Sequence, residues 1–370
     1  MNRTSLRRVA APTVAALALG LSLSACGASN ENQTSSDKAA KQSGNISGTL
    51  NGAGSSAQEA AQGAWTAGFQ SANQNVTVNY DPSGSGAGVE QVLAGGVKFA
   101  GSDAYLTSQE ISQSKKACGG SEAIEVPDYI SPIALIYNLK GVNNLQLSPS
   151  TAAGIFSGKI TKWNDKAIAA DNPGVKLPSA NITPVHRSDD SGTTDNFTDY
   201  LHQTASSVWT NAASETWPYK SGEGAEGTSG VVQAVTNGAN TIGYADASQA
   251  GKLGVAKIKV GSKYVAPTAA GAAKAVSLAK TVPGRSSSDM ALALNRTTTD
   301  SSAYPALLVS YLIGCPSYKS ANDAALVKGY MGYIVSPSGQ QASAKVAGNA
   351  PLPSSLGTKA AAQVSKIAKG

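Results

Sequence analysis

Four short segments rich in small polar residues could do chemistry, and each follows a predicted strand. They are Ser55-Ser56, the run from Ser83 to Gly88, Asp103, and the run from Arg187 to Thr194. Hydroxyls and unpaired backbone N–H groups at the start of a helix favour an anion, and Arg187 adds a planar guanidinium suited to an oxyanion. Glycines in these turns let the backbone approach a ligand closely. Each turn alone is better explained as a helix cap, so the prediction of an anion site depends on all four falling at equivalent strand ends.

The elements that must position these turns alternate short strands with helices. The predicted strands span residues 45–51, 76–80, 99–103 and 182–185, and the predicted helices span residues 57–71, 89–94 and 269–279. This succession indicates parallel βαβ units, which bind ligands at the carboxyl ends of their strands. The two most apolar strand candidates, residues 130–137 and 306–313, are predicted to cross between two lobes.

Composition narrows the class of protein. The chain has 370 residues, of which 41% are hydrophobic and 14% are charged, so it is apolar enough to fold and long enough for about two domains. Its formal charge of +6 includes Arg3, Arg7 and Arg8 of a predicted leader; without these three, +3 remains, spread thinly. A nucleic-acid binder needs a dense basic face, which this sequence lacks. We therefore expect no nucleic-acid partner.

The first 25 residues are predicted to be a signal peptide. A basic start and an apolar run over residues 9–23 precede Leu23-Ser24-Ala25-Cys26, which resembles the lipobox of bacterial lipoproteins. Cys26 is therefore expected to carry palmitate and other lipid and to hold the mature chain at the outer face of the cell membrane. Residues 26–45 are expected to be a flexible tether. The alternative is an ordinary cleavage site that contains a cysteine, and the sequence leaves export by the Sec or the twin-arginine route open.

The other two cysteines are predicted to pair. Cys118 lies in a glycine-rich loop and Cys315 precedes a proline, and both settings are poor places for a buried core thiol. An even number of cysteines in an exported chain favours a Cys118–Cys315 disulfide. The alternative is two separately buried thiols.

Six segments, taken in order and spacing, resemble the phosphate-binding protein of the bacterial high-affinity phosphate ABC importer. They are Gly52–Ser56, Gly84–Gly86, Ser102–Ala104, Gly158–Asp165, Arg187–Thr193 and Ile242–Tyr244. The resemblance covers about residues 46–356. It implies a two-lobed, hinged α/β solute-binding fold of the type II periplasmic-binding-protein kind, each lobe a mixed, mainly parallel sheet flanked by helices. The implied lobe 1 is 46–136 with 304–370, and the implied lobe 2 is 137–303.

The same resemblance implies the function. A monomeric, extracytoplasmic lipoprotein would capture inorganic phosphate in the cleft between the lobes and deliver it to the permease subunits of the importer. Carried over position by position, its phosphate ligands are Ser56, Ser85, Asp103, Arg187, Ser191, Gly192 and Thr193, with the backbone N–H of Ala57. Asp189 matches the carboxylate that pairs with the arginine. Ala57 departs from the family, because many relatives carry an aromatic residue there. No catalytic residue, metal or cofactor is implied.

Asp103 is predicted to distinguish between anions by their protonation state. A carboxylate beside an anion repels it unless the ligand has a proton to donate. Hydrogen phosphate has such a proton near neutral pH and sulfate does not, so Asp103 is expected to reject sulfate.

Two alternatives come from other classes of function. The first is a receptor for another tetrahedral oxyanion of the sulfate or molybdate class. The second is a secreted phosphate-ester hydrolase, which is disfavoured because the sequence has no GxSxG elbow and only two histidines, His186 and His202, without metal-site spacing. Gly222 to Gly227 matches a lone GxGxxG, but its two glutamates oppose a pyrophosphate, so it is interpreted as a loop before a helix that begins near Thr228.

Overall fold

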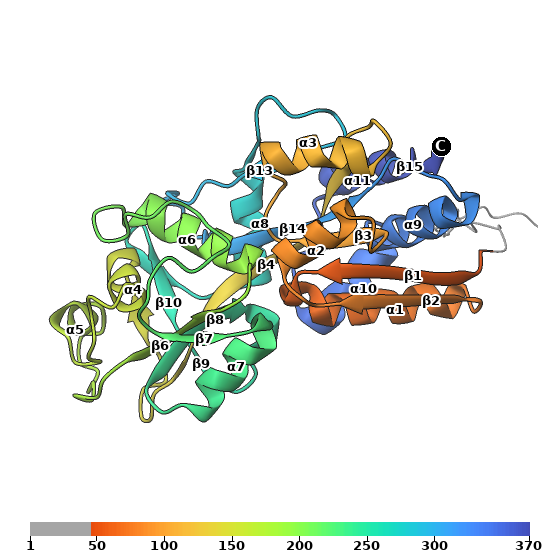
Figure 1. Ribbon diagram of the computed structural model, residues 1–370. Coiled ribbons are helices and arrows are strands. Elements are labelled where there is room, and N and C mark those ends of the chain that lie inside the picture. Colours follow the sequence, from red (N-terminus) through yellow and green to blue (C-terminus); the bar gives the residue numbers. More distant parts are fainter. Residues whose placement is uncertain (1–45) are drawn as a thin grey trace, which may run out of the picture. The chain divides into compact units, whose positions relative to one another are not determined.

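The computed structural model describes residues 46–370 (Figure 1). Its helices are η1 Ser56–Gln58, α1 Glu59–Ala72, α2 Ser85–Leu93, α3 Ser108–Ala117, α4 Pro149–Phe156, α5 Lys166–Asp171, α6 Gly192–Thr204, α7 Gly227–Asn237, η2 Ala247–Gln249, α8 Ala269–Ser277, α9 Ala321–Ile334, α10 Pro337–Ala347 and α11 Ser354–Val364. Its strands are β1 Gly48–Gly54, β2 Val76–Asp81, β3 Phe99–Ser102, β4 Ile124–Asn138, β5 Gln146–Leu147, β6 Thr183–Arg187, β7 Glu223–Ala225, β8 Thr241–Asp246, β9 Gly254–Val255, β10 Lys257–Val260, β11 Lys263–Val265, β12 Lys280–Thr281, β13 Leu292–Ala293, β14 Leu307–Gly314, β15 Ser317–Tyr318 and β16 Ala368–Lys369. The predicted signal peptide, Cys26 and the predicted tether lie outside the described residues.

The main sheet has the strand order β2-β1-β3-β14-β4-β8-β6-β7, with β9 also paired to β4. The outer strands pair in parallel, β1 with β2 and β3, and β6 with β7 and β8. Every pair that involves β4 or β14 is antiparallel. The parallel units at both ends bring the carboxyl ends of β1, β2, β3 and β6, and therefore the predicted polar turns, toward the middle of the sheet.

Strand β4 joins the two halves of this sheet. Its residues from Ile124 to Pro132 pair with β14, and its residues from Ile133 to Asn138 pair with β8. We call the half with β1, β2, β3 and β14 lobe 1, and the half with β6, β7, β8 and β9 lobe 2. The predicted crossing at residues 130–137 is therefore confirmed. The predicted crossing at 306–313 is wrong, because β14 pairs only with β3 and β4 of lobe 1.

Two boundaries differ from the sequence prediction. Helix α2 begins at Ser85, four residues before the predicted start at Val89, and so includes glycines that have low helix propensity. The segment predicted as a loop before Thr228 contains the short strand β7, which pairs with β6. In both places tertiary contacts outweigh local propensity.

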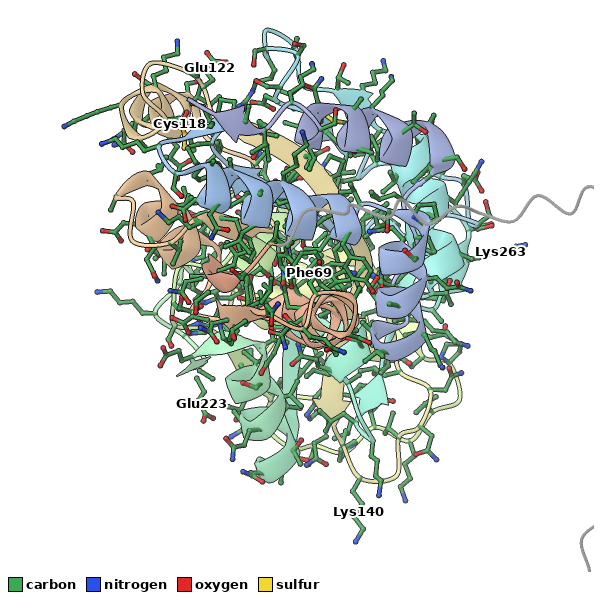
Figure 2. All side chains as sticks on the ribbon, turned by 90° about the vertical axis from the view of Figure 1, so that its right-hand side faces the viewer. Phe69, Cys118, Glu122, Lys140, Glu223 and Lys263 are labelled. Carbon is green, nitrogen blue, oxygen red and sulfur yellow. A yellow bond between two sulfur atoms is a disulfide. The ribbon has the colours of Figure 1, made fainter. Side chains whose placement is uncertain are left out.

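Helices cover both faces of the sheet in lobe 1. Helices α1 and α10 lie on one face of β1 and α2 lies on the other (Figure 1). Leu50 of β1 belongs to the core cluster that contains Trp65 and Phe69 of α1, whereas Ala53 belongs to the cluster that contains Val89 of α2. Figure 2 shows Phe69 among packed side chains while Lys140 and Lys263 project outward. No helix among residues 46–370 is long and apolar enough to span a membrane.

The segment from α8 to β13 packs on lobe 1. Ala272 and Val276 of α8 share a core cluster with Ala53 of β1 and Ile313 of β14. The backbone N–H of Met290 also donates to the carbonyl of Glu125 in β4, at 2.9 Å. The lobe boundary expected at residue 303 stays a prediction, and these contacts favour placing residues 269–303 with lobe 1.

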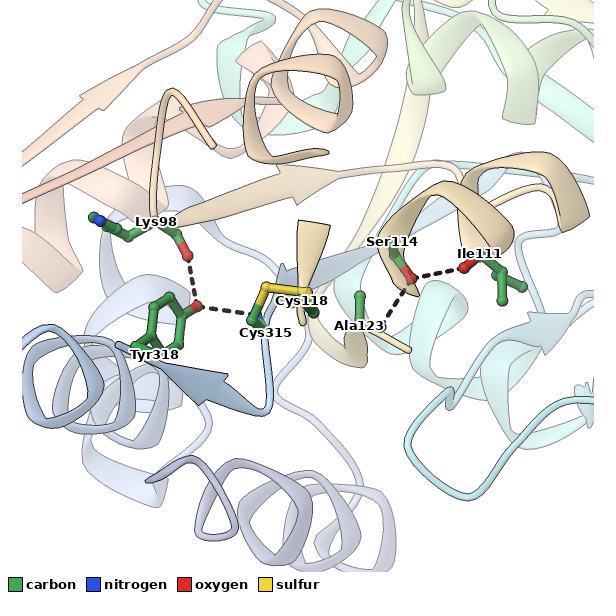
Figure 3. The surroundings of a disulfide bond; sticks show 7 residues. All are labelled: Lys98, Ile111, Ser114, Cys118, Ala123, Cys315 and Tyr318. Carbon is green, nitrogen blue, oxygen red and sulfur yellow. Dashed lines mark hydrogen bonds between the residues drawn. A yellow bond between two sulfur atoms is a disulfide. The ribbon is translucent and has the colours of Figure 1, made fainter. Parts of the chain in front are cut away.

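The predicted disulfide is present. Cys118, just after α3, is bonded to Cys315, just after β14, across 197 residues of sequence. Figure 3 shows the bond between two anchored segments: Tyr318 Oη accepts from the Cys315 N–H and donates to the Lys98 carbonyl, and Ser114 Oγ accepts from the Ala123 N–H. The disulfide therefore links the segment after α3 to the segment after β14, both in lobe 1, and contacts no predicted ligand residue.

Replacing both cysteines with serine is expected to lower the free energy of unfolding by about 2 to 4 kcal/mol, because the unfolded chain then gains the entropy of a long open loop. Urea unfolding with and without reductant measures this change. Reductant should destabilise only the parent protein. An equal effect of reductant on the Cys118→Ser/Cys315→Ser variant would contradict the assignment.

Candidate functional site

Asp103 lies at the centre of the predicted site, just after β3. Its Oδ2 accepts from Thr193 Oγ1 of lobe 2 at 2.8 Å, and its Oδ1 accepts from the Ser310 hydroxyl of β14. Its backbone N–H donates to Ser85 Oγ at 3.1 Å. Burial raises the pKa of Asp103, and hydrogen bonds from Ser310, Ser55 and Thr193, together with the charge of Arg187, oppose that rise. The hydroxyls therefore favour the ionised carboxylate that burial disfavours.

Ser56 connects the first turn of lobe 1 to a helix of lobe 2. Its Oγ accepts from the backbone N–H of Thr228 at 2.9 Å and lies 3.0 Å from Thr228 Oγ1. The N-terminus of α7 therefore points at Ser56. The backbone N–H of Ala57 is bonded to Ser55 Oγ at 3.1 Å, so this predicted donor serves as a cap contact in the structure.

Arg187 and Asp189 form the predicted pair. Arg187 Nε donates to Asp189 Oδ1 at 2.7 Å, and Nη2 donates to Oδ2. Asp189 Oδ1 also accepts from the backbone N–H of Gly227 at 3.0 Å, at the start of α7. Burial raises the pKa of Asp189, but the hydrogen bonds and charge of Arg187 outweigh burial and leave the pKa below its ordinary value. The pair is thus ionised and close to neutral overall.

The first turn of α6 packs directly against lobe 1. Ser191 caps this helix, with its Oγ accepting from the Thr194 N–H at 3.2 Å. Gly192 follows, and a Cβ built there would lie 2.6 Å from the backbone nitrogen of Ala104 and 2.7 Å from Ser85 Oγ. Only glycine fits at this distance, because real Cβ atoms do not approach other atoms so closely. Gly192 therefore lets the two lobes meet at Asp103.

A similar contact lies at the start of α2. Gly84 has a φ of +103°, and a Cβ there would lie 2.7 Å from Asp189 Oδ2. The Gly86 N–H donates to the Asp190 carbonyl across the lobes at 3.2 Å. Because Gly84 and Gly86 have no Cβ, the Asp189 carboxylate and the Asp190 backbone of lobe 2 can lie directly against the N-terminus of α2.

The structure brings all the predicted ligand positions to one place between the lobes. Their side chains are almost completely buried, and each exposes 3% or less of its surface: Ser56, Ala57, Ser85, Asp103, Arg187, Ser191 and Thr193. Donors from η1, α2, α6 and α7 converge there, together with one compensated arginine. Such an arrangement can bind a small anion through hydroxyls and backbone amides.

Sequence reasoning missed three residues of this site. Ser310 is a single serine inside an apolar strand, and that contrast was the available signal. Thr228 lies in the first turn of α7, where the sequence predicted only the start of a helix. Tyr244 Oη accepts from the Arg187 N–H at 3.2 Å and lies 2.7 Å from Thr194 Oγ1.

His186 and Trp163 have structural roles. His186 Nδ1 lies 2.8 Å from the Arg187 carbonyl, and its ring stacks on Trp217 with centroids 4.9 Å apart. Burial lowers the pKa of His186. Trp163 is fully buried and belongs to the hydrophobic core. Among residues 46–370, no group of three or more histidine, cysteine or acidic side chains could hold a metal ion.

Comparison with known proteins gives a consistent result. A sequence model of the PBP superfamily domain matches residues 39–338. Phosphate-binding protein PstS 2 of Mycobacterium tuberculosis is 36% identical over 365 residues, covering 96% of this chain and 97% of that protein. Phosphate-binding protein PstS 3 of Mycobacterium leprae is 34% identical over 364 residues, covering 95% and 97%.

Solved structures share the fold. A high-affinity periplasmic phosphate-binding protein, solved with bound phosphate, has a TM-score of 0.71 at 23% identity and covers 85% of this chain and 93% of its own. A phosphate-binding protein from Stenotrophomonas maltophilia has a TM-score of 0.65 at 19% identity, with 85% and 93% covered. These likenesses agree with the two-lobed α/β architecture. By sequence and by fold, the chain belongs to the PstS family of phosphate-binding proteins in the PBP superfamily.

Proposed function

We propose that this protein captures inorganic phosphate between its lobes and delivers it to an ABC permease. The observation that carries the proposal is the buried Asp103 carboxylate, which accepts hydroxyl bonds from both lobes beside the Arg187–Asp189 pair. The names of its PstS relatives support phosphate as the ligand. The role is binding and delivery rather than catalysis.

The chemistry of capture follows from the donors. The proposed ligands Ser56, Ser85 and Ser191 offer hydroxyls, whereas the Thr193 hydroxyl donates to Asp103. The N-termini of α2, α6 and α7 offer backbone N–H groups and the positive ends of helix dipoles. Arg187 uses Nε and one N–H of Nη2 for Asp189, which leaves Nη1 and the other N–H of Nη2 for an oxyanion. The phosphate oxygen that carries a proton would donate to Asp103. Sulfate and molybdate have no such proton at neutral pH, so phosphate is the better match.

We further propose that the mature chain is an extracytoplasmic, monomeric lipoprotein. The sequence around Cys26 supports a lipid anchor, and the PstS family assignment supports a place outside the cytoplasm. Mass spectrometry of the purified membrane-bound form tests the anchor, because lipid at Cys26 adds mass to the N-terminal peptide. An unmodified Cys26 peptide would refute it.

The variant Asp103→Asn tests the ligand and its discrimination together. Wild type should prefer phosphate over sulfate by on the order of 10⁴-fold, and the variant should lose most of this preference because an amide can donate to sulfate. Isothermal titration with each anion measures both affinities. A wild type that does not bind phosphate would refute the function, and unchanged discrimination in the variant would refute only the role of Asp103.

Phosphate affinity should depend only weakly on salt. Because Asp189 compensates Arg187, long-range attraction contributes little, and the dissociation constant should change by less than about threefold between about 20 and about 200 mM salt. The matched variant Asp189→Asn exposes the charge of Arg187 and should show a steeper dependence. A steep fall for wild type would contradict the compensated site.

Glu215 makes the closed structure sensitive to pH. A Cβ built on Gly86 of lobe 1 would lie 2.9 Å from Glu215 Oε2, so this carboxyl of lobe 2 abuts α2. Burial, followed by the nearby carboxyls of Asp195, Glu110, Asp190 and Asp103, raises the pKa of Glu215 to about 8. The folded chain therefore keeps a proton that the unfolded chain loses near the ordinary pKa of glutamate. Folding stability from this proton is complete at low pH and is lost as the pH rises toward 8.

Replacement of Glu215 with glutamine removes that loss. The free energy of unfolding should exceed that of wild type by roughly 3 kcal/mol more near pH 8 than near pH 5, because glutamine has no proton to lose. Urea unfolding at the two pH values measures the difference. The exposed Glu223→Gln serves as the control, and an equal effect of Glu215→Gln at both pH values would count against a raised pKa.

A further inference from the structure

Asn196 joins the lobes at a point outside the proposed ligand set. It lies in α6, one turn beyond Gly192, and exposes 6% of its surface. Its Nδ2 donates to the Asp103 carbonyl of lobe 1 at 2.8 Å and to the Gly192 carbonyl of its own helix at 2.9 Å. One amide group therefore bonds the backbones of both lobes behind the anion site.

Arg296 fixes the orientation of that amide. Its Nη2 donates to Asn196 Oδ1 at 2.6 Å, and its Nη1 donates to the carbonyls of Pro305 and Leu307 at 2.9 and 2.7 Å. Arginine can only donate hydrogen bonds, and a backbone carbonyl can only accept them. Asn196 must therefore turn its oxygen to Arg296 and its NH₂ group to Asp103. Leu307 begins β14, so Arg296 is anchored in lobe 1.

The second contact of Arg296 with lobe 2 is more exposed. Its Nε donates to Asp199 Oδ2 at 2.9 Å, and Asp199 exposes 27% of its side chain. Both residues line a cavity of about 250 Å³ that also includes Tyr105 and Tyr311. Asn196 lines the same cavity but exposes only 6% of its surface, so solvent screens its amide bonds less than it screens the ion pair. The Asn196 bonds are therefore the stronger connection between the lobes.

We propose that Asn196, oriented by Arg296, is a closure latch that holds the lobes together without touching the anion. The proposal rests on the proposed capture of phosphate between the lobes. Separation of α6 from Asp103 would break the amide bond and replace it with bonds to water, so each opening loses the net contribution of a protein hydrogen bond. The latch sets how long the closed form lasts and therefore how long phosphate is retained. Asn196 and Arg296 are positioning residues, because they act through the closed arrangement.

The variant Asn196→Asp removes the latch with the least change in shape. Aspartate keeps an oxygen for Arg296 but cannot donate to the Asp103 carbonyl. Asn196→Ala is the second variant, and Gln341→Ala on the exposed surface of α10 is the control. Urea unfolding establishes that each variant is folded.

Stopped-flow phosphate binding gives the first readout. The dissociation rate of phosphate should rise roughly tenfold in both Asn196 variants, while the association rate and the preference for phosphate over sulfate stay unchanged. The Gln341→Ala control should match wild type. An unchanged dissociation rate overturns the latch. A loss of anion preference overturns it too, since Asn196 would then act on the ligand contacts.

Hydrogen exchange of the ligand-free protein gives a second readout that does not depend on phosphate. The Thr228 N–H is bonded to Ser56 across the lobes, so exchange in residues 226–230 should quicken when the lobes part. Both Asn196 variants should exchange faster there than wild type and the control. Unchanged exchange overturns the latch even if phosphate binds. If wild type binds no phosphate, the proposed function is wrong, but the hydrogen-exchange comparison still tests whether Asn196 holds the lobes together.

Discussion

The hydrogen bonds around Asp103 are the interaction on which the rest of the site depends. A buried carboxyl without donors keeps its proton and cannot accept one from a ligand. Thr193 and Ser310 supply hydroxyls from α6 and from β14, and the Ser85 hydroxyl holds the backbone of Asp103. Because Thr193 belongs to lobe 2, the acceptor at the centre of the site is completed only when the lobes meet. Anion recognition and closure are therefore parts of the same set of contacts.

Strand order explains why only part of this set could be predicted from the sequence. The four polar turns were predictable because each is local: a short apolar run, then small polar residues, then helical spacing. Ser310 reaches Asp103 across 207 residues, through the antiparallel pairing of β14 with β3, in which Tyr311 lies opposite Ser102. No local pattern reports a pairing of that range. The same distance in sequence explains why β14 was mistaken for a crossing between lobes.

Helix α2 shows a different kind of error: its start was predicted too late because its first residues have low helix propensity, and tertiary contacts outweigh that propensity. Its first turn is rich in glycine, which disfavours a helix in isolation. Here the glycines serve close contacts: a Cβ on Gly88 would lie 2.4 Å from the Cα of Gly54, and one on Gly86 would lie 2.8 Å from the Cβ of Asp190. The cost of a glycine-rich helix start is offset by the approach of β1 and of lobe 2. Positions where propensity and structure disagree therefore mark the site.

The neutral Arg187–Asp189 pair explains how a chain with few charges could bind an anion. Arg187 alone would attract any anion from a distance, with little distinction between them. Asp189 cancels most of that field, and the Gly227 N–H at the start of α7 stabilises Asp189 in turn. Asp189 also faces Gly84 of lobe 1, so the compensating carboxylate lies in the interface between the lobes. Selectivity must then come from short-range hydrogen bonds, whose directions the closed lobes fix, and an anion of the wrong protonation state leaves Asp103 facing a like charge.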